Sequence, residues 1–235
     1  MKIQITKKQN VFFCSDPHYH HSSLVRGTSN WEDKSPCRDF DTLEEHDNTL
    51  VNNINNTVDT NDILFCLGDW NFGQYKDSVR LAKEFRSRIN CKTLHLILGN
   101  HDKHIARNKE GVQGIFTTVG NYREVLIIDE PVGQKVKAIK THVVLSHYAH
   151  RVWNKSHRGA FMLYGHSHNT LDAMTPEIAN PTWIGDDYYI KNYRTIDVGF
   201  DTHKEFRPYS WQEIKEIMKN KNVELEIDHH GKERD

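Results

Sequence analysis

Five short hydrophobic runs in this chain each end abruptly in aspartate, asparagine or histidine. Short apolar runs of this kind are typical of buried β-strands. Polar side chains that follow directly after a buried strand are costly to bury unless they have partners. The five runs, with the residues that end them, are VFFCSDPHYH from residue 11, ILFCLGDW from 63, LHLILGNHD from 94, VVLSHYAH from 143 and FMLYGHSH from 161.

The polar residues at these ends predict one shared site. In open α/β folds, ligands bind beyond the carboxyl ends of the strands, where the loops converge. Each motif alone has an ordinary explanation as a turn or a surface histidine, but that explanation would have to hold independently at all five ends. A common site is therefore the better interpretation. The residues delivered to it are Asp16, His18, Asp69, Asn100, His101, Asp102, His147, His166 and His168.

The donor types at these ends predict bound metal. Carboxylate, amide oxygen and imidazole without thiolate suit Mn²⁺, Fe and Zn²⁺. Two aspartates, an asparagine and at least four histidines make seven candidate ligands, which exceed the three protein ligands of a single catalytic zinc ion. They match a pair of ions that share a carboxylate. Two ions about 3.5–4 Å apart can hold a hydroxide between them and clamp the oxygens of a phosphoryl group during in-line displacement.

The order of the remaining patterns predicts an α/β sandwich folded as one domain over residues 1–235. Helices are expected at 42–58, where Thr42 and Glu45 have capping-box spacing, at 76–89 and at 210–220. Strands are expected at 11–15, 63–67 and 94–98, then at 123–129 and 135–140 around a hairpin, and finally at 143–146, 160–164 and 195–200.

Composition limits the partners and the compartment. Lysine plus arginine (31) nearly equals aspartate plus glutamate (32), so bulk charge gives no attraction to nucleic acid. No apolar segment has the length of a membrane span or of a signal-peptide core. The four cysteines lack Cys-x-x-Cys spacing, which favours buried thiols in a reducing compartment. We therefore expect a cytoplasmic protein without membrane partners.

The five motifs, in this order, resemble those of the calcineurin-like metallophosphoesterases. They are Asp16-x-His18, Gly68-Asp69, Gly99-Asn100-His101-Asp102, His147 and Gly165-His166-Ser167-His168. The stretch DVGFDTHKEFRPYSWQEI also resembles the closing segment of short bacterial and phage members. The resemblance covers most of the chain and implies the four-layer α/β/β/α sandwich of this family, with two divalent ions. We expect Mn²⁺ first, with Fe, Zn²⁺ and Ni²⁺ as alternatives.

The resemblance also implies a role for each residue. His101 is not a ligand in this pattern and would stabilise charge on the reacting phosphate or protonate the leaving oxygen. Asp102 would orient the His101 imidazole by a hydrogen bond and raise its pKa. One ion would be held by Asp16, His18 and His168, Asp69 would bridge, and Asn100, His147 and His166 would complete the second ion's shell.

The ester that is cleaved depends on loops, here 17–40, 148–160 and 169–192. His21 matches a histidine often found in short members, and Arg26 and Arg151 are further candidate substrate contacts. Basic residues around Trp153 could hold a phosphate while the indole stacks a base. The alternative is a solvated loop with a packed tryptophan.

Three functions are compatible with these residues. The leading hypothesis is a phosphodiesterase or phosphomonoesterase for a nucleotide or another small phosphorylated molecule. A nuclease with the same metal chemistry would need a longer basic groove, which the neutral net charge disfavours. A scaffold without activity would have lost His101 or some ligands, and this sequence keeps them all. One chain carries the whole constellation, so a monomer can be active, and the choice between monomer and dimer stays open.

Overall fold

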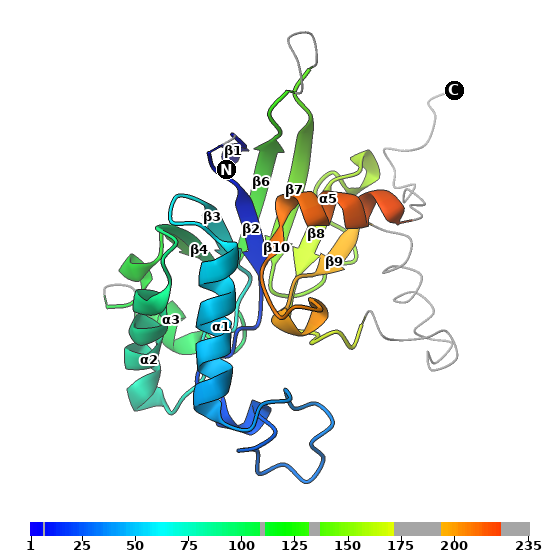
Figure 1. The fold of residues 1–235 in the computed structure, drawn as a ribbon. Helices are drawn as coiled ribbons and strands as arrows, with labels where there is room; N and C mark the ends of the chain where they lie inside the picture. The colour runs from blue at the N-terminus through cyan, green and yellow to red at the C-terminus, as the bar shows by residue number, and fades with distance from the viewer. Residues whose placement is uncertain (7, 109–110, 132–136, 172–193, 222–235) are drawn as a thin grey trace, which may run out of the picture.

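The described residues form two packed five-stranded sheets (Figure 1). The computed structural model describes the chain except for residues 7, 109–110, 132–136, 172–193 and 222–235. The first sheet has the order β10 (Tyr209–Ser210), β2 (Val11–Cys14), β3 (Ile63–Cys66), β4 (Thr93–Ile97) and β5 (Thr118–Gly120). The second has the order β1 (Lys2–Gln4), β6 (Tyr122–Ile128), β7 (Lys140–Ser146), β8 (Phe161–Tyr164) and β9 (Thr195–Asp197).

Helices cover the first sheet and close one end of the sandwich. α1 (Leu43–Thr57) and α2 (Tyr75–Arg88) lie side by side on the outer face of the first sheet, and α5 (Trp211–Asn220) lies across the sandwich near β8 and β10 (Figure 1). The short elements are α3 (Lys103–Arg107), η1 (Ser22–Leu24), η2 (Gln113–Ile115), η3 (Ser156–Arg158) and η5 (Phe200–Thr202). No helix in the described part of the chain is both long enough and apolar enough to cross a membrane.

Parallel strands carry the polar motifs to one edge of the molecule. Cys14 of β2 pairs with Cys66 of β3, and Cys66 pairs with Leu96 of β4. In the second sheet, Leu145 of β7 pairs with Leu163 of β8 in the same parallel sense. Because the paired strands end in register, the residues that follow them leave each sheet at the same edge.

Two apolar layers explain why the central strands are continuous hydrophobic runs. Between the sheets, the rings of Phe13 and Phe65 stack with centroids 5.5 Å apart and belong to a buried cluster with Leu145 and Leu163. On the other face, Phe12 of β2 packs in the cluster that includes the inner sides of α1 and α2. A strand that is buried on both faces carries apolar residues at successive positions, without alternation of polar and apolar side chains.

The outer face of the second sheet is covered differently. Val144, Met162 and Tyr164 of this sheet pack with Trp153 and Ala160. Within the described residues, the segment 148–160, which contains η3, therefore covers this face. With the two sheets and the helices on the first, this arrangement confirms the predicted sandwich class.

Side chains cap the starts of α5 and α1. Ser210 and Glu213, for which no cap was predicted, form a reciprocal capping box at the start of α5. At α1, only half of the predicted box is present, because the Thr42 hydroxyl accepts from the Glu45 N–H while the Glu45 carboxylate accepts from the Asp41 N–H.

All four cysteines are buried and free, as predicted.

Two parts of the strand prediction were wrong. The predicted antiparallel pairing is present between β6 and β7. Residues 135–136 of the predicted strand at 135–140 lie outside the described residues, and 137–139 are not in a strand. Lys140 instead begins one strand that continues through the predicted strand at 143–146. Thr141 and His142 interrupt the apolar run, yet their backbones pair with Ile127 and Leu126 and continue the ladder. β1, β5 and β10 were missed because strands of two or three residues carry too little periodicity to detect.

Candidate metal centre

The seven predicted ligands converge at the common edge of the sheets. Six of them form two groups, and within each group one ligand atom per residue lies within 4.8 Å of the others. Asn100 joins the second group, because its Oδ1 is 2.9 Å from His147 Nε2. The first group is Asp16, His18 and His168, and the second is Asp69, His147 and His166.

One oxygen of Asp69 lies between the two groups. Its Oδ2 is 3.6 Å from His18 Nε2 and also 3.6 Å from His147 Nε2. The other oxygen, Oδ1, accepts the His101 backbone N–H at 2.8 Å. Burial raises the pKa of Asp69 to about 6; His147 opposes the rise and the nearby Asp16 carboxylate adds to it. A cation at this oxygen would favour the ionised form.

The histidine tautomers present free lone pairs to the centre. His147 Nδ1 is 2.8 Å from the Leu67 carbonyl oxygen, which can only accept, so Nδ1 carries the proton and Nε2 has the lone pair. As oriented here, the Asn100 oxygen and this nitrogen are two acceptors that face each other. A bound cation satisfies both.

His168 is oriented in the same way by Asp201. Its Nδ1 is 2.7 Å from Asp201 Oδ2, which leaves Nε2 free, 3.2 Å from His18 Nε2. Both nitrogens are 3.8–3.9 Å from Asp16 Oδ1. Donor atoms that share an ion at about 2.0–2.2 Å lie roughly 3–4 Å from one another, so this set fits a divalent ion.

Asp16 gives independent evidence that these residues fit a cation. Its Oδ2 accepts the His166 backbone N–H at 2.8 Å, whereas its buried Oδ1 has no hydrogen-bond partner. A buried carboxylate oxygen without a partner costs free energy. The unpaired oxygen is the one that faces His18 and His168, so the residues present fit a metal ion.

The backbone is strained at the ligands themselves. A positive φ costs a residue with a side chain about 1 kcal/mol or more, and such strain concentrates at functional sites. Five of the seven predicted ligands have it: Asp16 (54°), His18 (49°), Asp69 (54°), His166 (70°) and His168 (45°). The surrounding structure therefore holds the ligand loops in conformations that they would not adopt alone.

Close packing beside Asp16 makes a specific prediction for Gly165. A Cβ at this position would overlap Ser15 Oγ and Asp16 Oδ2. We expect Gly165→Ala to displace the Asp16 carboxylate and to weaken metal binding about 10- to 100-fold, the usual cost of disturbing the support of a ligand. Metal titration monitored by calorimetry measures this change.

Gly114 offers a matched control for that substitution, since a Cβ there would have no atom within 4 Å. Gly114→Ala should leave metal affinity unchanged. Equal affinities of the two alanine variants would contradict the argument from close packing at Gly165.

His101 lies over the centre without joining either group. Its side chain is 37% exposed, and its Nε2 is 4.0 Å from Asp69 Oδ2. The ring is held edge-on by His18 and Phe72, with centroids 5.4 and 5.1 Å away. An imidazole that is close to the shared oxygen and open to solvent can reach a substrate bound there.

The predicted action of Asp102 on His101 was wrong in its geometry. The fully buried Asp102 carboxylate accepts the backbone N–H groups of Asp69, Trp70 and Gly99 at 2.8–2.9 Å, and no described hydrogen bond joins it to the His101 imidazole. The turns after β3 and β4 direct these N–H groups towards Asp102, so both carboxylate oxygens are used by the backbone. Asp102 thus ties together the loops that follow β3 and β4.

Asp102 does raise the pKa of His101, as predicted, but it does not set the net direction. Burial lowers the pKa of His101, and this effect outweighs the Coulombic attraction of Asp102. Burial raises the pKa of Asp102 itself to about 6, with Asp69 adding to the rise and the backbone N–H bonds reducing it.

The candidate substrate contacts lie in different surroundings. His21 is buried, stacks on Phe72 with centroids 3.8 Å apart, and places its Nδ1 3.3 Å from His18 Nδ1. It therefore supports a ligand. Arg26 pairs with Asp39 at 2.9 Å on the surface, and the exposed Arg151 makes no described hydrogen bond or ion pair. Neither arginine contacts the ligand groups in the described structure, so a substrate role for them stays a prediction.

The position of Trp153 bears on the two alternatives for the loop 148–160, a base-stacking indole or a packed tryptophan. Trp153 is buried and donates its Nε1–H to the Ala160 carbonyl at 3.0 Å, which agrees with a packed tryptophan rather than a stacking platform. Most of the predicted loop 169–192 lies outside the described residues.

A buried arginine that supports the centre was missed. Arg38 lies in the loop 17–40 and forms a two-point ion pair with Asp201, Nε to Oδ1 and Nη2 to Oδ2, both at 2.8 Å. It also donates to the Asp16 and Pro17 carbonyls at 2.6 and 2.8 Å. Although burial opposes it, Arg38 holds the pKa of Asp201 below its usual value, so a carboxylate faces His168. The DVGFD motif was the available signal for Asp201.

An α/β sandwich that gathers histidine and carboxylate side chains at its strand ends is the architecture of a metal-dependent phosphoesterase. Residues 10–227 match the model of the calcineurin-like phosphoesterases, and the chain belongs to this family. Members hydrolyse phosphate esters with the help of bound divalent metal ions, typically two. The resemblance inferred from the five motifs is thereby confirmed.

Individual relatives are distant. The chain is 30% identical over 95 residues to the uncharacterized protein MJ1445 of Methanocaldococcus jannaschii, a match that covers 40% of this chain and 48% of that protein. It is 26% identical over 175 residues to the gene 66 protein of Mycobacterium phage L5, covering 69% of this chain and 79% of the phage protein. The crystal structure of AQ665 from Aquifex aeolicus, a protein of unknown function, has the same fold, with a TM-score of 0.54 at 20% identity over 89% of this chain and 99% of AQ665.

Proposed function

We propose that this protein is a two-metal hydrolase of phosphodiesters or phosphomonoesters, with a small nucleotide-like substrate. The observation that carries the proposal is the position of Asp69 Oδ2, which is equally far from a histidine of each ligand group. In this proposal, Asp69 would be shared by two ions, Mn²⁺ being the first candidate and Fe, Zn²⁺ and Ni²⁺ the alternatives. Asp16, His18 and His168 would hold one ion, and Asn100, His147 and His166 would complete the ligand set of the other.

When bound, the ions supply positive charge that polarises the phosphoryl group and activates water. The chain supplies the rest. Leu67 and Asp201 fix the tautomers of His147 and His168, so that each presents Nε2. Asp102 sets the distance between the loops after β3 and β4. His101 lies within reach of the reacting group and donates a proton or a hydrogen bond to the leaving oxygen.

Aromatic residues beside both ligand groups support a small substrate with a flat ring. The Tyr148 side chain is 47% exposed, with its ring centroid 4.8 Å from that of His166. On the other side, Trp31 is 41% exposed and lies edge-on to His21 at 6.5 Å. Exposed aromatic faces can stack a nucleobase.

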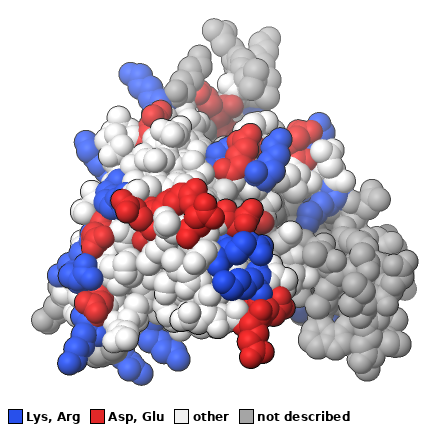
Figure 2. All heavy atoms as spheres, turned by 60° about the horizontal axis from the view of Figure 1, so that its bottom comes forward, with Lys and Arg blue, Asp and Glu red and all other residues white. Residues whose placement is uncertain are grey.

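The charge distribution favours a small molecule over a polynucleotide. Figure 2 brings the bottom of Figure 1 forward, and on the face that it shows basic and acidic side chains are interspersed, with acidic ones forming a band across the middle. A nuclease requires a continuous basic track for the phosphate backbone. The face in Figure 2 does not present one.

The test is hydrolysis of two model esters by the metal-stripped protein after addition of Mn²⁺, Ni²⁺, Zn²⁺ or Mg²⁺. Metal-dependent turnover of bis-p-nitrophenyl phosphate or p-nitrophenyl phosphate is the expected result, and the ratio of the two rates assigns the diester or monoester preference. Failure to bind stoichiometric metal would overturn the proposal. Bound metal without turnover of these esters, or of a panel of nucleotide esters, would favour the non-catalytic scaffold.

His101→Gln is expected to lower kcat about 10²- to 10⁴-fold, the usual contribution of a positioned proton donor. Because His101 belongs to neither ligand group, the metal content should stay at the wild-type level. Steady-state kinetics and metal analysis of the same preparation check both parts.

His150→Gln provides the control, since the His150 ring stacks on Tyr122 and belongs to neither ligand group. This variant should keep wild-type kcat. A His101→Gln enzyme with a kcat within threefold of wild type would remove His101 from the chemistry.

A further inference from the structure

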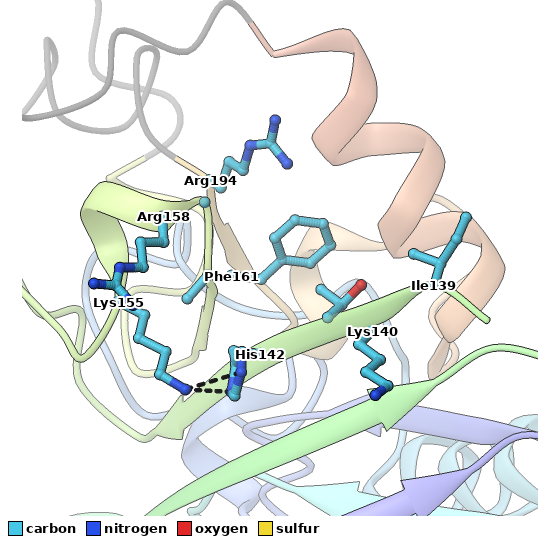
Figure 3. A pocket seen from close by; sticks show the side chains of 10 residues that line it. Ile139, Lys140, His142, Lys155, Arg158, Phe161 and Arg194 are labelled. Carbon is cyan, nitrogen blue, oxygen red and sulfur yellow. Dashed lines mark hydrogen bonds between the residues drawn. The ribbon is translucent and has the colours of Figure 1, made fainter. Parts of the chain in front are cut away.

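A cavity lies far from the metal centre, at the ends of β7 and β8 opposite to those that carry the ligands. It has a volume of about 340 Å³. Its lining includes Lys140, His142, Lys155, Arg158, Phe161 and Arg194 (Figure 3). The strand β7 begins at Lys140, beside this cavity, and ends at Ser146, the residue before His147. The six residue steps from Thr141 to His147 span roughly 20 Å at about 3.3 Å per residue. The cavity is therefore separate from the ligand groups.

The charge of this cavity is of one sign. Four lining residues are lysine or arginine, and none is aspartate or glutamate, in a chain whose basic and acidic residues are nearly equal in number. Among the described residues, no carboxylate forms an ion pair with Lys140, Lys155, Arg158 or Arg194. Cations gathered around one cavity repel each other and attract an anion.

Arg194 carries an unmet hydrogen-bonding demand. Its buried Nε has no hydrogen-bond partner in the described structure. Its guanidinium lies over the Phe161 ring, with Cζ 5.8 Å from the ring centroid. A guanidinium has five N–H donors in a planar fork that matches the oxygens of a phosphate. An anion in the cavity would supply the missing acceptor.

Lys155 is held at the cavity by an unusual backbone. Its φ is +62° at the start of η3, a costly conformation for a residue with a side chain. Its ammonium donates to His142 Nε2 at 2.9 Å, as the dashed lines in Figure 3 show. Burial lowers the pKa of His142 and Lys155 lowers it further, against Glu124, so the imidazole accepts as a neutral ring. The ammonium keeps further protons for a ligand.

We propose that this cavity binds a phosphorylated small molecule with two or more phosphate groups. The phosphates would contact Lys155, Arg158 and Arg194, and the Phe161 ring would form an apolar wall beside them. The volume falls within the range of small-molecule sites. A polynucleotide is disfavoured because the basic residues line one cavity of a chain with a net charge of −1, rather than a long track.

The test measures calorimetric binding of methylenediphosphonate, a pyrophosphate analogue that resists hydrolysis. It uses the full chain with its metal ions, together with Asp69→Asn, Arg158→Glu and Arg194→Gln. Asp69→Asn disables the metal centre, so binding that persists in this variant reports the cavity. We expect the affinity in the Asp69→Asn background to fall at least tenfold with Arg158→Glu or Arg194→Gln, and to fall with added salt.

Lys83→Glu is the control for a change of charge alone, since Lys83 is exposed on α2 and forms no described ion pair. It should bind the analogue as tightly as its parent, and thermal unfolding of every variant verifies that it is folded. Loss of all binding in Asp69→Asn, or equal effects of Arg158→Glu and Lys83→Glu, would overturn the proposal. Binding of a single-stranded oligonucleotide without binding of the diphosphonate would overturn it as well, in favour of a nucleic acid.

Discussion

Replacing Asp69 by asparagine is expected to lower metal-dependent ester hydrolysis about a thousandfold and to remove at least one bound ion. Asparagine has nearly the same shape and keeps an oxygen for the His101 N–H, which Asp69 Oδ1 accepts at 2.8 Å. It loses the charge of the oxygen that lies between His18 and His147. Metal catalysis contributes several kcal/mol, and about 4 kcal/mol corresponds to a thousandfold in rate.

Asp62→Asn is the matched control, because it changes another buried aspartate in the same way. Asp62 accepts the backbone N–H groups of Asn10 and Asp59 at 2.7 and 3.0 Å and contacts no predicted ligand. Its variant should keep both the metal content and kcat. Elemental analysis and kinetics decide the outcome, and an Asp69→Asn protein with full metal content and a tenth or more of the activity would exclude a bridging role.

The convergence of the ligands could be predicted because each one follows directly after a buried strand. The strand is recognisable from its apolar run, and parallel strands end in register, as Cys14, Cys66 and Leu96 do here. A ligand next to a strand end is therefore placed by the sheet itself. For that reason, local patterns alone placed residues as far apart as Asp16 and His168 at one site.

The support of the centre could not be predicted in this way. Arg38 and Asp201 meet across most of the chain, and neither lies in a periodic segment that would place it. The partners of Asp102 are backbone N–H groups, whose directions depend on the turns after β3 and β4 rather than on any side chain in the sequence. The pKa of His101 depends on burial in the assembled site, which the Gly-Asn-His-Asp motif does not encode.

The contribution of Arg38 to stability can be measured. Arg38→Met is expected to lower the free energy of unfolding by about 3–5 kcal/mol, the cost of removing one partner of a buried ion pair. The Arg38 side chain is 3% exposed, and its loss removes the guanidinium that pairs with the Asp201 carboxylate and the donors to the Asp16 and Pro17 carbonyls. Chemical denaturation of the metal-free protein measures the change.

Arg26→Met is the control from the same loop. Arg26 also pairs with an aspartate, but its side chain is 47% exposed, and exposed pairs contribute about 0–1 kcal/mol. If the two variants lose equal stability, burial is not what makes the Arg38 pair important.

The double variant Arg38→Met/Asp201→Leu separates two contributions to the lost stability: the loss of the ion pair itself and the cost of leaving the Asp201 carboxylate unpaired. Removing both partners leaves no unpaired buried carboxylate, so this protein should be more stable than Arg38→Met alone by at least 1 kcal/mol. It would still lack the acceptor for His168 Nδ1. We therefore expect it to regain stability without regaining metal affinity, because the stability of this loop depends on pairing the charge, while the metal site depends on the Asp201 oxygen that orients its ligand.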